Sequence, residues 1–364
     1  MNETKIDIKI KEYTIPSFKR QNTSEIIVEE QEVQELMNLS YETNEIKIDS
    51  IDQLDCTWRK VLKIKFSKSL TYVPGDSLGI ITPNSKEFVL QFMEFCGFTN
   101  KFVKIKKKRR FNYEGSLFNF FYKYFDFRVL PKKAFFYFLS KECNNPLLEY
   151  LSSNEGEDDY FNILRNNMNL YDLLTYFDVK PSLDLVIEYS ELIKPRYFSL
   201  INPSGKSSEI IVGLIENGHS SDFFYKAKEK FDDYVFPFLI KENRLLRLQS
   251  DKPILCIATG TGVTPFISFS NENKYIWLVY GCRNKEDDIS IYGNFLEKDI
   301  AYSSKNIRIS NILEEKKEKV KEYILNYQVY ICASTTVQKS IYEYLKNNFG
   351  DHLLRNKVFF DDWS

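Results

Sequence analysis

The chain has 364 residues, which is long enough for two domains with an inserted third, and 43% of them are apolar. Lysine and arginine (50) nearly balance aspartate and glutamate (51), so no global field steers the protein to nucleic acid or to a membrane surface. The six cysteines are scattered and only two histidines are present, which argues against a metal centre and a histidine triad. The charged N-terminus and the lack of an apolar run of about 20 residues predict a cytoplasmic protein with reduced thiols and no membrane span.

The first part of the chain favours β-structure. Residues 1–24 are expected to form a loosely held arm. Four segments then follow in which β-favouring residues alternate or cluster between polar turns. These segments are residues 25–30, 45–49, 58–66 and 77–82, with a turn at 73–76 before the last. They predict pieces of an antiparallel barrel.

From residue 85 to about residue 188 the apolar period becomes helical. The segments with this period are residues 88–95, 117–124, 135–139, 147–151, 160–164 and 170–177. Their dense Phe and Tyr stripes indicate helix-packing surfaces rather than a stacking platform for bases. About a hundred residues of helix are therefore expected to interrupt the barrel.

A basic run, KFVKIKKKRR, covers residues 101–110 within that insertion. A solvated loop is the first interpretation of such a run, and a docking patch for an acidic protein is the second. Nucleic-acid binding is the third, because one short run in a chain of balanced charge is a poor footprint for it.

Strands resume at residues 196–201 and 209–216, and a helix is expected at 222–231. The turn Gly218-His219-Ser220-Ser221 stands directly before that helix. Hydroxyl and N–H groups at a helix start can hold a phosphate group, so this turn is a candidate phosphate site.

The stretch from Asp251 to Phe269 has the most informative pattern. Ile254 to Ala258 is a short unbroken apolar run, typical of a buried parallel strand, and it ends in Gly260-Thr261-Gly262. Thr264 and Pro265 then open a helix. Such a turn favours phosphate, although a tight strand-to-helix connection without a ligand gives the same pattern.

The remaining residues alternate strand and helix. Strands are expected at residues 275–281, 307–312, 329–333 and 358–361, and helices at 286–298, 315–325 and 336–347. This alternation predicts a doubly wound parallel sheet, in which ligands bind at the carboxyl ends of the strands. Gly260 to Gly262, Cys282 and Cys332 fall at those ends.

Six motifs in this order resemble the ferredoxin–NADP reductase superfamily, and more closely the FAD/NADPH half of the diflavin reductases. They are Pro74-Gly75-Asp76 with Leu78-Gly79, Arg196 to Ser199, Gly218 to Ser221, Gly260 to Phe266, Tyr280 to Arg283, and Asp361 to Ser364. The resemblance implies an FAD-binding barrel at residues 25–84 and 189–250, a helical connecting insertion at 85–188, and an NADP-binding α/β domain at 251–364.

The resemblance also implies an FAD site. Arg196 would pair with the pyrophosphate, for which a guanidinium fork has matching geometry, and Tyr197 lies beside it in the motif. Phe198 would lie against the isoalloxazine, where the family usually has Tyr, and Ser199 would hydrogen-bond near N5. Gly218, His219, Ser220 and Ser221 would cradle the pyrophosphate. The alternative for Arg196 and Ser199 is an ordinary edge-strand pair.

For the coenzyme, the resemblance implies that Gly260, Thr261, Gly262 and Thr264 bind the NADPH pyrophosphate and that Cys282 and Arg283 line its path. Cys332 matches the cysteine beside the nicotinamide, although it could equally be a buried core residue, and Ala333-Ser334 replaces the usual Gly-Asp. Asp361 matches the acidic residue of the hydride path. Trp363 matches the terminal indole that covers the flavin as a gate, the alternative being an apolar tail in the core.

The family recognises the 2′-phosphate of NADPH with a Ser-Arg pair, whereas here Asn311 follows Ser310. Lys319 and Lys321 are predicted to supply the missing positive charge. We therefore expect NADPH as the coenzyme, with NADH as the alternative.

The expected activity is hydride transfer from NADPH to FAD, followed by single-electron transfer to a separate protein. No segment before residue 25 has the length of an FMN-binding flavodoxin domain, so a flavodoxin-like, haem or iron–sulfur protein is the expected acceptor, docking near residues 101–110. Two alternatives are a single-flavin ferredoxin-type reductase and a non-catalytic interaction protein that retains the fold. Phe198, Asn311 and Ala333 depart from the family pattern and favour the last.

Overall fold

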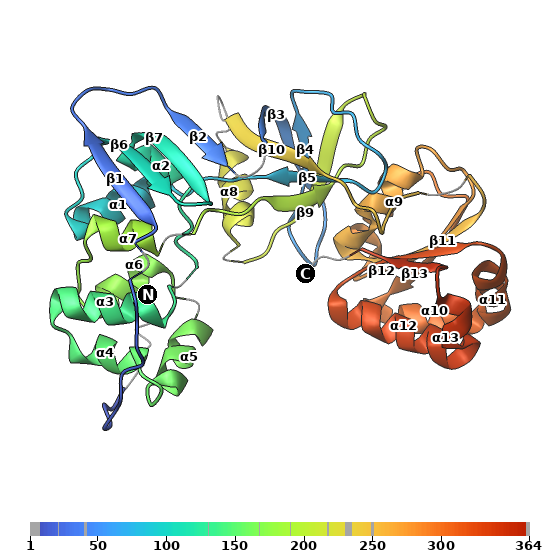
Figure 1. Ribbon diagram of the computed structural model, residues 1–364. Helices are drawn as coiled ribbons and strands as arrows, with labels where there is room; N and C mark the ends of the chain where they lie inside the picture. Colours follow the sequence, from blue (N-terminus) through green and yellow to red (C-terminus); the bar gives the residue numbers. More distant parts are fainter. Residues whose placement is uncertain are drawn as a thin grey trace. The chain divides into compact units, whose positions relative to one another are not determined.

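The computed structural model describes residues 8–20, 22–39, 42–129, 131–166, 168–189, 191–216, 218–229, 235–248 and 251–361. The chain forms two compact units (Figure 1). The first comprises Met1–Glu42 and Thr82–Lys194, and the second comprises Thr43–Ile81 and Pro195–Ser364. Within the described residues, no helix combines the length and apolar character needed to cross a bilayer.

The first unit contains a four-stranded antiparallel sheet in the order β1-β6-β7-β2. Its strands are β1 (Ser24–Glu29), β2 (Leu36–Leu39), β6 (Phe102–Lys107) and β7 (Phe111–Ser116). The expectation that residues 25–30 belong to the barrel is wrong, because β1 pairs along its whole length with β6. The sequence pattern identified this strand correctly but carried no information about its partner.

The same unit holds the predicted helices and one that was not predicted, α7. The helices are α1 (Lys86–Cys96), α2 (Leu117–Lys123), α3 (Lys133–Cys143), α4 (Pro146–Ser152), α5 (Glu157–Arg165), α6 (Leu170–Tyr176) and α7 (Leu183–Glu188). Aromatic rings fill the space between them: the Phe127 ring centroid lies 4.8 Å from that of Phe92 and 4.5 Å from that of Phe125. The aromatic stripes are therefore helix-packing surfaces, as predicted.

The basic run is not a loop, contrary to the first interpretation, because residues 102–107 form strand β6. Val103, Ile105 and Lys107 alternate inward and are buried. The Lys107 ammonium donates to the Ile187 carbonyl at 3.2 Å, and burial lowers the pKa of Lys107 to about 8. On the other face of β6, Lys104 forms an ion pair with Glu29 at 3.0 Å. Lys104 and Lys107 of the basic run therefore have polar partners within the unit.

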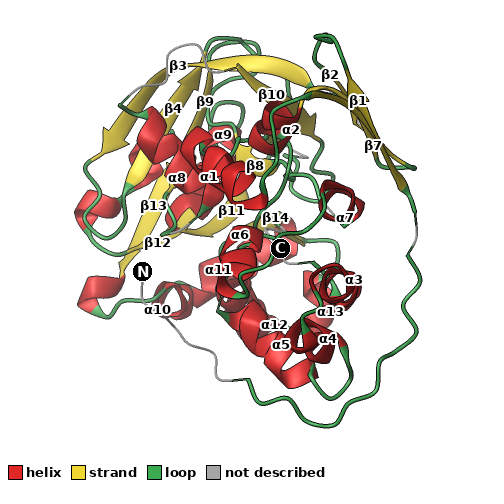
Figure 2. Ribbon diagram, turned by 90° about the vertical axis from the view of Figure 1, so that its left-hand side faces the viewer, coloured by secondary structure: helices red, strands yellow, loops and turns green. Residues whose placement is uncertain are grey.

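The second unit begins with a six-stranded antiparallel sheet in the order β8-β5-β10-β3-β4-β9. Its strands are β3 (Asn44–Leu54), β4 (Val61–Phe66), β5 (Ser77–Ile80), β8 (Arg196–Ser199), β9 (Ser208–Gly213) and β10 (Val235–Lys241). Figure 2 shows β3, β4 and β9 side by side. A bridge between Leu200 and Ile210 joins the two outer strands, so the sheet closes into the predicted barrel. Strand β10 was not predicted.

The second unit ends with a five-stranded parallel sheet in the order β13-β12-β11-β14-β15, which confirms the predicted doubly wound domain. The strands are β11 (Ile254–Thr259), β12 (Ile276–Cys282), β13 (Glu297–Tyr302), β14 (Gln328–Cys332) and β15 (Val358–Phe360). The helices are α8 (His219–Ala227) on the barrel, then α9 (Thr264–Phe269), α10 (Ile309–Glu315), α11 (Lys317–Asn326), α12 (Thr335–Phe349) and α13 (Asp351–Leu354).

Two predicted elements of this domain are wrong. The helix expected at residues 286–298 is replaced by two short 3₁₀ turns, Lys285–Asp287 and Ile289–Tyr292, and by the start of β13. The strand expected at 307–312 is helix α10, because Ile309, Ile312 and Leu313 have helical spacing and bury one face. The β-favouring isoleucines suggested a strand, but their spacing matches the helix.

Alternate residues of the central strand pack on opposite faces of the sheet. Leu255 and Ile257 of β11 pack with apolar residues of α10, α11, α12 and α13, and Figure 1 shows α10, α12 and α13 along one side of the sheet. Ile254, Cys256 and Ala258 pack with α9 and with barrel residues such as Val61 and Ile211. This second face therefore joins the sheet to the barrel within one unit.

Candidate active site

The turn after β11 has a backbone conformation that requires glycine. Gly260 has a φ of +52°, in the left-handed region. A Cβ atom on Gly262 would lie 2.3 Å from the Cys332 carbonyl oxygen, so no larger residue fits there without displacing the end of β14. The Thr264 hydroxyl donates to the Thr261 carbonyl at 2.9 Å and closes the turn. The prediction of a tight strand–turn–helix connection is confirmed.

Cys332 and Asp361 lie beside this turn. The Cys332 thiol is 3.5 Å from the Asp361 Oδ2 atom, and both side chains are buried. The backbone N–H of Asp361 donates to the Ile331 carbonyl at 3.0 Å, which fixes it next to the carboxyl end of β14. Gly262, Cys332 and Asp361, separated by up to a hundred residues in the sequence, thus form one cluster. The neighbouring Ala333 is also buried.

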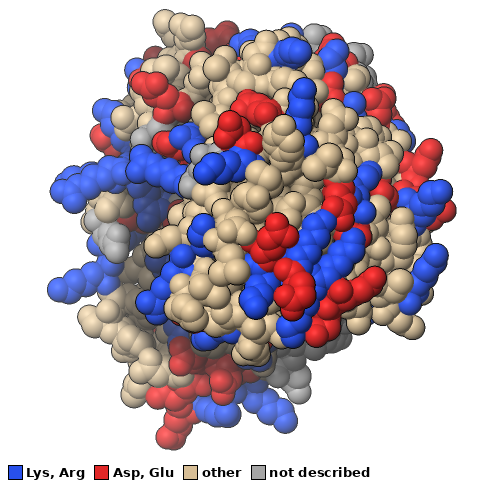
Figure 3. Space-filling view, turned by 90° about the vertical axis from the view of Figure 1, so that its right-hand side faces the viewer, with Lys and Arg blue, Asp and Glu red and all other residues tan. Residues whose placement is uncertain are grey.

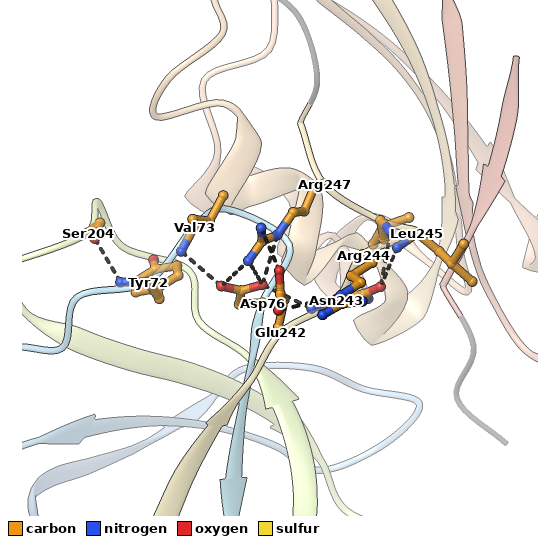
Figure 4. A network of polar contacts seen from close by, with 10 residues as sticks. Tyr72, Val73, Asp76, Ser204, Glu242, Asn243, Arg244, Leu245 and Arg247 are labelled. Atoms are coloured by element: carbon orange, nitrogen blue, oxygen red, sulfur yellow. Dashed lines mark hydrogen bonds and ion pairs between the residues drawn. The ribbon is translucent and has the colours of Figure 1, made fainter. Parts of the chain in front are cut away.

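A second network connects the barrel to this cluster, and Figure 4 shows the part of it around Asp76. The Asp76 carboxylate accepts hydrogen bonds from the backbone N–H groups of Val73 and Asn243, at 3.1 and 3.0 Å. Arg247 donates to both Asp76 oxygens, at 3.1 and 3.2 Å. The Asn243 Nδ2 atom donates to Asp361 Oδ1 at 2.9 Å. Asn243 and Arg247 were missed by sequence reasoning, because residues 242–248 carry no recognisable pattern.

The predicted flavin-binding strand β8 runs from an exposed residue at its start to two buried residues at its end. Arg196 is exposed, and the Tyr197 ring covers Gly79, whose hypothetical Cβ would lie 2.7 Å from it. Phe198 is buried in the barrel core, with its ring edge-on to Phe224 of α8 at 5.9 Å. The Ser199 side chain is buried, and its hydroxyl has no hydrogen-bond partner among the described residues. A buried hydroxyl without a partner is costly and indicates a missing polar group.

The turn before α8 is held by the hydroxyl group of Ser221. The Ser221 Oγ atom accepts a hydrogen bond from the Ile215 N–H at 3.0 Å, so it closes the loop between β9 and α8. His219 and Ser220 are partly exposed in the first turn of α8, and Gly218 precedes them. Because Phe224 contacts Phe198, helix α8 packs against the strand that carries Arg196.

Further residues lie at the carboxyl end of β12. The Arg283 guanidinium lies 4.2 Å from the Trp58 ring centroid, and the Asp287 carboxylate accepts from the Trp58 N–H at 3.0 Å. Burial raises the pKa of Cys282 to about 12, so this thiol stays protonated at neutral pH. Arg59 and Thr261 both lie beside Gly213, within 3.4 and 3.1 Å of its hypothetical Cβ. Trp58 and Arg59 were missed, although an exposed Trp-Arg pair in a loop was a usable signal.

Ser310 lies near this carboxyl edge, but Lys319 does not. The Ile309 side chain packs on Gly281, whose hypothetical Cβ would lie 3.3 Å from it, so the start of α10 lies over the end of β12. Lys319 instead pairs with Glu297 and lies 4.2 Å from the Trp277 ring centroid, at the amino ends of β12 and β13. Five residues of β13 separate Glu297 from the carboxyl edge, a span of roughly 16 Å. Lys321 follows two residues later in α11 and is exposed.

Lys319 belongs to a charged cluster of its own. Lys316 lies 2.6 Å from Asp299 and 3.2 Å from Glu297, and the Trp277 indole donates to Asp299 at 2.7 Å. On the face of the protein seen in Figure 3, basic and acidic side chains likewise lie next to one another. The geometry therefore assigns Lys316 and Lys319 to ion pairs that join α10 and α11 to β13. Trp363 lies outside the described residues.

Comparisons with known proteins agree with the motifs. Residues 29–213, just over half of the chain, match the family described as FAD binding domain. The chain belongs to this family. The similarity extends to proteins that contain such a domain. NADPH-dependent diflavin oxidoreductase 1 of Dictyostelium discoideum is 27% identical over 327 residues, which is 75% of this chain and 50% of that protein.

Two other relatives of this chain are named for different activities. Methionine synthase reductase of Rattus norvegicus is 26% identical over 293 residues, covering 63% of this chain and 41% of that protein. Nitric oxide synthase of Anopheles stephensi is 20% identical over 375 residues, covering 85% of this chain and 30% of that protein. The chain spans about half the length of the diflavin oxidoreductase that it matches, and less of the other two. The predicted resemblance to diflavin reductases is confirmed.

Proposed function

We propose that this chain binds FAD and NADPH and catalyses hydride transfer between them. The observation that supports this most directly is the cluster of Gly262, Cys332 and Asp361 at the carboxyl edge of the parallel sheet. Ligands of doubly wound sheets bind at this edge. The cluster combines a turn that permits close approach of a phosphate with a thiol and a carboxylate beside it, and a barrel of the FAD-binding family belongs to the same unit.

The barrel residues fit FAD. The Ser199 hydroxyl, which has no hydrogen-bond partner among the described residues, lies in the strand that also carries the exposed Arg196, and helix α8 packs against that strand through Phe224. We infer that Arg196 and residues 218–221 hold the pyrophosphate and that Ser199 hydrogen-bonds the ring system. When bound, FAD supplies the hydride acceptor and can then release electrons singly. Phe198 is buried beneath α8. The isoalloxazine ring of FAD would therefore contact the edge of the Phe198 ring that faces away from Phe224.

The chain's own residues orient and shield the reacting groups. Gly260 and Gly262 allow the backbone to approach the coenzyme pyrophosphate, and Arg59 and Arg283 add positive charge beside the turn. The Cys332 thiol and the Asp361 carboxylate are buried together, so they can present polar atoms to the nicotinamide without admitting water. Trp363 keeps its proposed role as a cover for the flavin.

Reconstitution tests this proposal. After incubation with FAD and removal of free flavin, the protein should retain FAD, and it should retain FMN poorly because FMN lacks the pyrophosphate bridged by Arg196 and α8. The loaded protein should then reduce ferricyanide with NADPH. Retention of FAD without any turnover would instead support the non-catalytic alternative, and failure to retain FAD would contradict the proposal.

For coenzyme choice we keep the predicted Ser310 and propose two cations in place of Lys319 and Lys321. Lys305 and Arg308 are exposed and follow Tyr302 at the carboxyl end of β13, and the Ser304 N–H donates to the Arg283 carbonyl at 3.1 Å. Asn311, which stands where the family has Arg, caps α10 by accepting from the Arg308 N–H at 2.7 Å. We propose that Lys305 and Arg308, together with Ser310, contact the 2′-phosphate of NADPH.

Replacing both Lys305 and Arg308 by alanine should raise the half-saturating concentration of NADPH about tenfold or more and leave that of NADH unchanged. Steady-state kinetics with the two coenzymes measures this. The matched control replaces Lys319 and Lys321, which removes the same number of charges from α11 and should leave the preference intact. A loss of preference in the control alone would restore the original assignment to Lys319 and Lys321.

The electron acceptor is proposed to be a separate protein, by analogy with the diflavin relatives. Within the basic run, the side chains of Lys106, Lys108 and Arg109 remain exposed near the β6–β7 turn, whereas Lys107 is buried and Arg110 pairs with Glu191 at 2.7 Å. We propose that these three cations, with Lys101, which is also exposed at the start of the run, are the part that an acidic flavodoxin-like or iron–sulfur protein contacts.

A further inference from the structure

The segment that joins the barrel strand β10 to the sheet strand β11 contains a residue in contact with both the barrel turn and Asp361. That residue is Asn243. Its backbone N–H donates to Asp76 at 3.0 Å, and its side chain donates to Asp361 at 2.9 Å. Asp76 is itself held by Arg247, so Asn243 is fixed at its backbone by the barrel (Figure 4).

The orientation of the Asn243 amide follows from its other contacts. The Oδ1 atom accepts from the backbone N–H groups of Leu245 and Leu246, at 3.3 and 3.0 Å. Only a carbonyl oxygen can accept these two bonds, so the NH₂ group must point to the opposite side, toward Asp361. The amide therefore works as a fixed donor.

The Asp361 carboxylate is consequently bound from two sides. Oδ1 accepts from Asn243, while Oδ2 lies 3.5 Å from the Cys332 thiol. A carboxylate held by one contact can rotate about its Cα–Cβ and Cβ–Cγ bonds, whereas donors on both oxygens fix its plane. The position of Oδ2 relative to Cys332 thus depends on a residue of the barrel connection rather than on the sheet alone.

We propose that Asn243 is a positioning residue for Asp361 in the hydride-transfer reaction. This inference rests on the proposed function, because Asp361 acts on the coenzyme only if the chain is a reductase. Asn243 does not touch the reacting atoms; it sets the direction of the carboxylate that does. Its removal should slow the transfer step more than it weakens coenzyme binding.

Two variants separate the donor from the structural role of Asn243. In Asn243→Asp the Oδ1 acceptor for Leu245 and Leu246 is kept, while the donor is replaced by an oxygen that faces Asp361. In Asn243→Ser the hydroxyl can still cap the turn, but it cannot reach Asp361, so it serves if the first variant is poorly folded. Arg244→Ala is the control, because Arg244 lies in the same segment and its side chain is 84% exposed.

The rate of bound-flavin reduction at saturating NADPH should fall about tenfold in both Asn243 variants, with the half-saturating NADPH concentration unchanged. In an Asp361→Ala background, Asn243→Ser should cause no further loss, because the residue through which it acts is gone. Multiplicative losses, or a rate within about twofold of the unmodified protein in both variants, would overturn the inference.

A readout without cofactors distinguishes this failure from failure of the proposed function. In the apoprotein, the decrease in urea midpoint caused by Asn243→Ser should shrink when Asp361 is already alanine. If the unmodified protein is never reduced by NADPH while this coupling is present, the proposed function is wrong but the contact is real. If the coupling is absent, the positioning role is wrong regardless of activity.

Discussion

Replacing Gly262 by alanine should reduce the rate of flavin reduction by NADPH about 100-fold or more while leaving FAD bound. The added Cβ would lie 2.3 Å from the Cys332 carbonyl oxygen and 3.3 Å from its thiol. Either the turn moves away from the coenzyme or the end of β14 moves, and both displace the cluster that contains Cys332 and Asp361. Stopped-flow absorbance of the FAD-loaded variant measures the rate.

Gly205→Ala is the matched control for this substitution. Gly205 has a positive φ of +73°, a backbone strain that Gly262 does not carry, but its hypothetical Cβ has open space around it. This variant should therefore be reduced at the rate of the unmodified protein. A Gly262→Ala variant with an unchanged reduction rate would show that the turn does not set the geometry of the reacting groups.

Replacing Gly75 by alanine should give the largest loss of stability among single glycine substitutions in the second unit. Gly75 has a φ of +102°, and its added Cβ would lie 1.8 Å from the Leu246 carbonyl oxygen. Strain and overlap together should lower the free energy of unfolding by about 3 kcal/mol or more. The clash would also push residues 242–248 away from Asp76, so the Asp76–Arg247 pair would be lost.

Urea unfolding followed by tryptophan fluorescence measures this loss, because Trp58 and Trp277 both lie in the second unit. Gly205→Ala again provides the comparison: with the same handedness of backbone but no overlap, it should lower the free energy of unfolding by only about 1 kcal/mol. Equal shifts of the two midpoints would mean that the contact between Gly75 and Leu246 does not constrain the fold.

The motifs whose function depends on local backbone geometry were predictable. Gly260 to Thr264 could be recognised because a sharp turn between a buried strand and a helix needs glycine regardless of the surroundings, although the Thr264 hydroxyl donates to the Thr261 carbonyl and does not cap the helix. The parallel sheet followed from the alternation of strand and helix. The strand β8 with Arg196 and Ser199 was found from its β-favouring residues and from the family motif.

Features that depend on tertiary partners were not predictable. Lys319 has the charge expected of a phosphate ligand, but its distance from the carboxyl edge is set by the length of β13, a strand that the sequence analysis did not predict. The run at 101–110 is basic, yet Lys107 is buried because β6 pairs with β1, more than seventy residues earlier. The role of Asn243 could not be predicted, because it depends on the contact that this residue of the barrel connection makes with Asp361 in the folded chain.

Membership of the family indicates that the barrel binds FAD, but it does not indicate one overall activity for the chain. The relatives have three different overall activities in their names, and this chain matches about half of the first and less of the others. The family match itself covers residues 29–213 and is described as an FAD binding domain. The proposed hydride transfer takes place within the second unit, before any acceptor is involved.

Anaerobic mixing of the FAD-loaded protein with NADPH tests this most directly. We expect the yellow flavin absorbance to bleach in a single turnover, faster with NADPH than with NADH, and without any added protein. A preparation that takes up FAD but keeps its colour after mixing with either coenzyme would contradict the proposed hydride transfer.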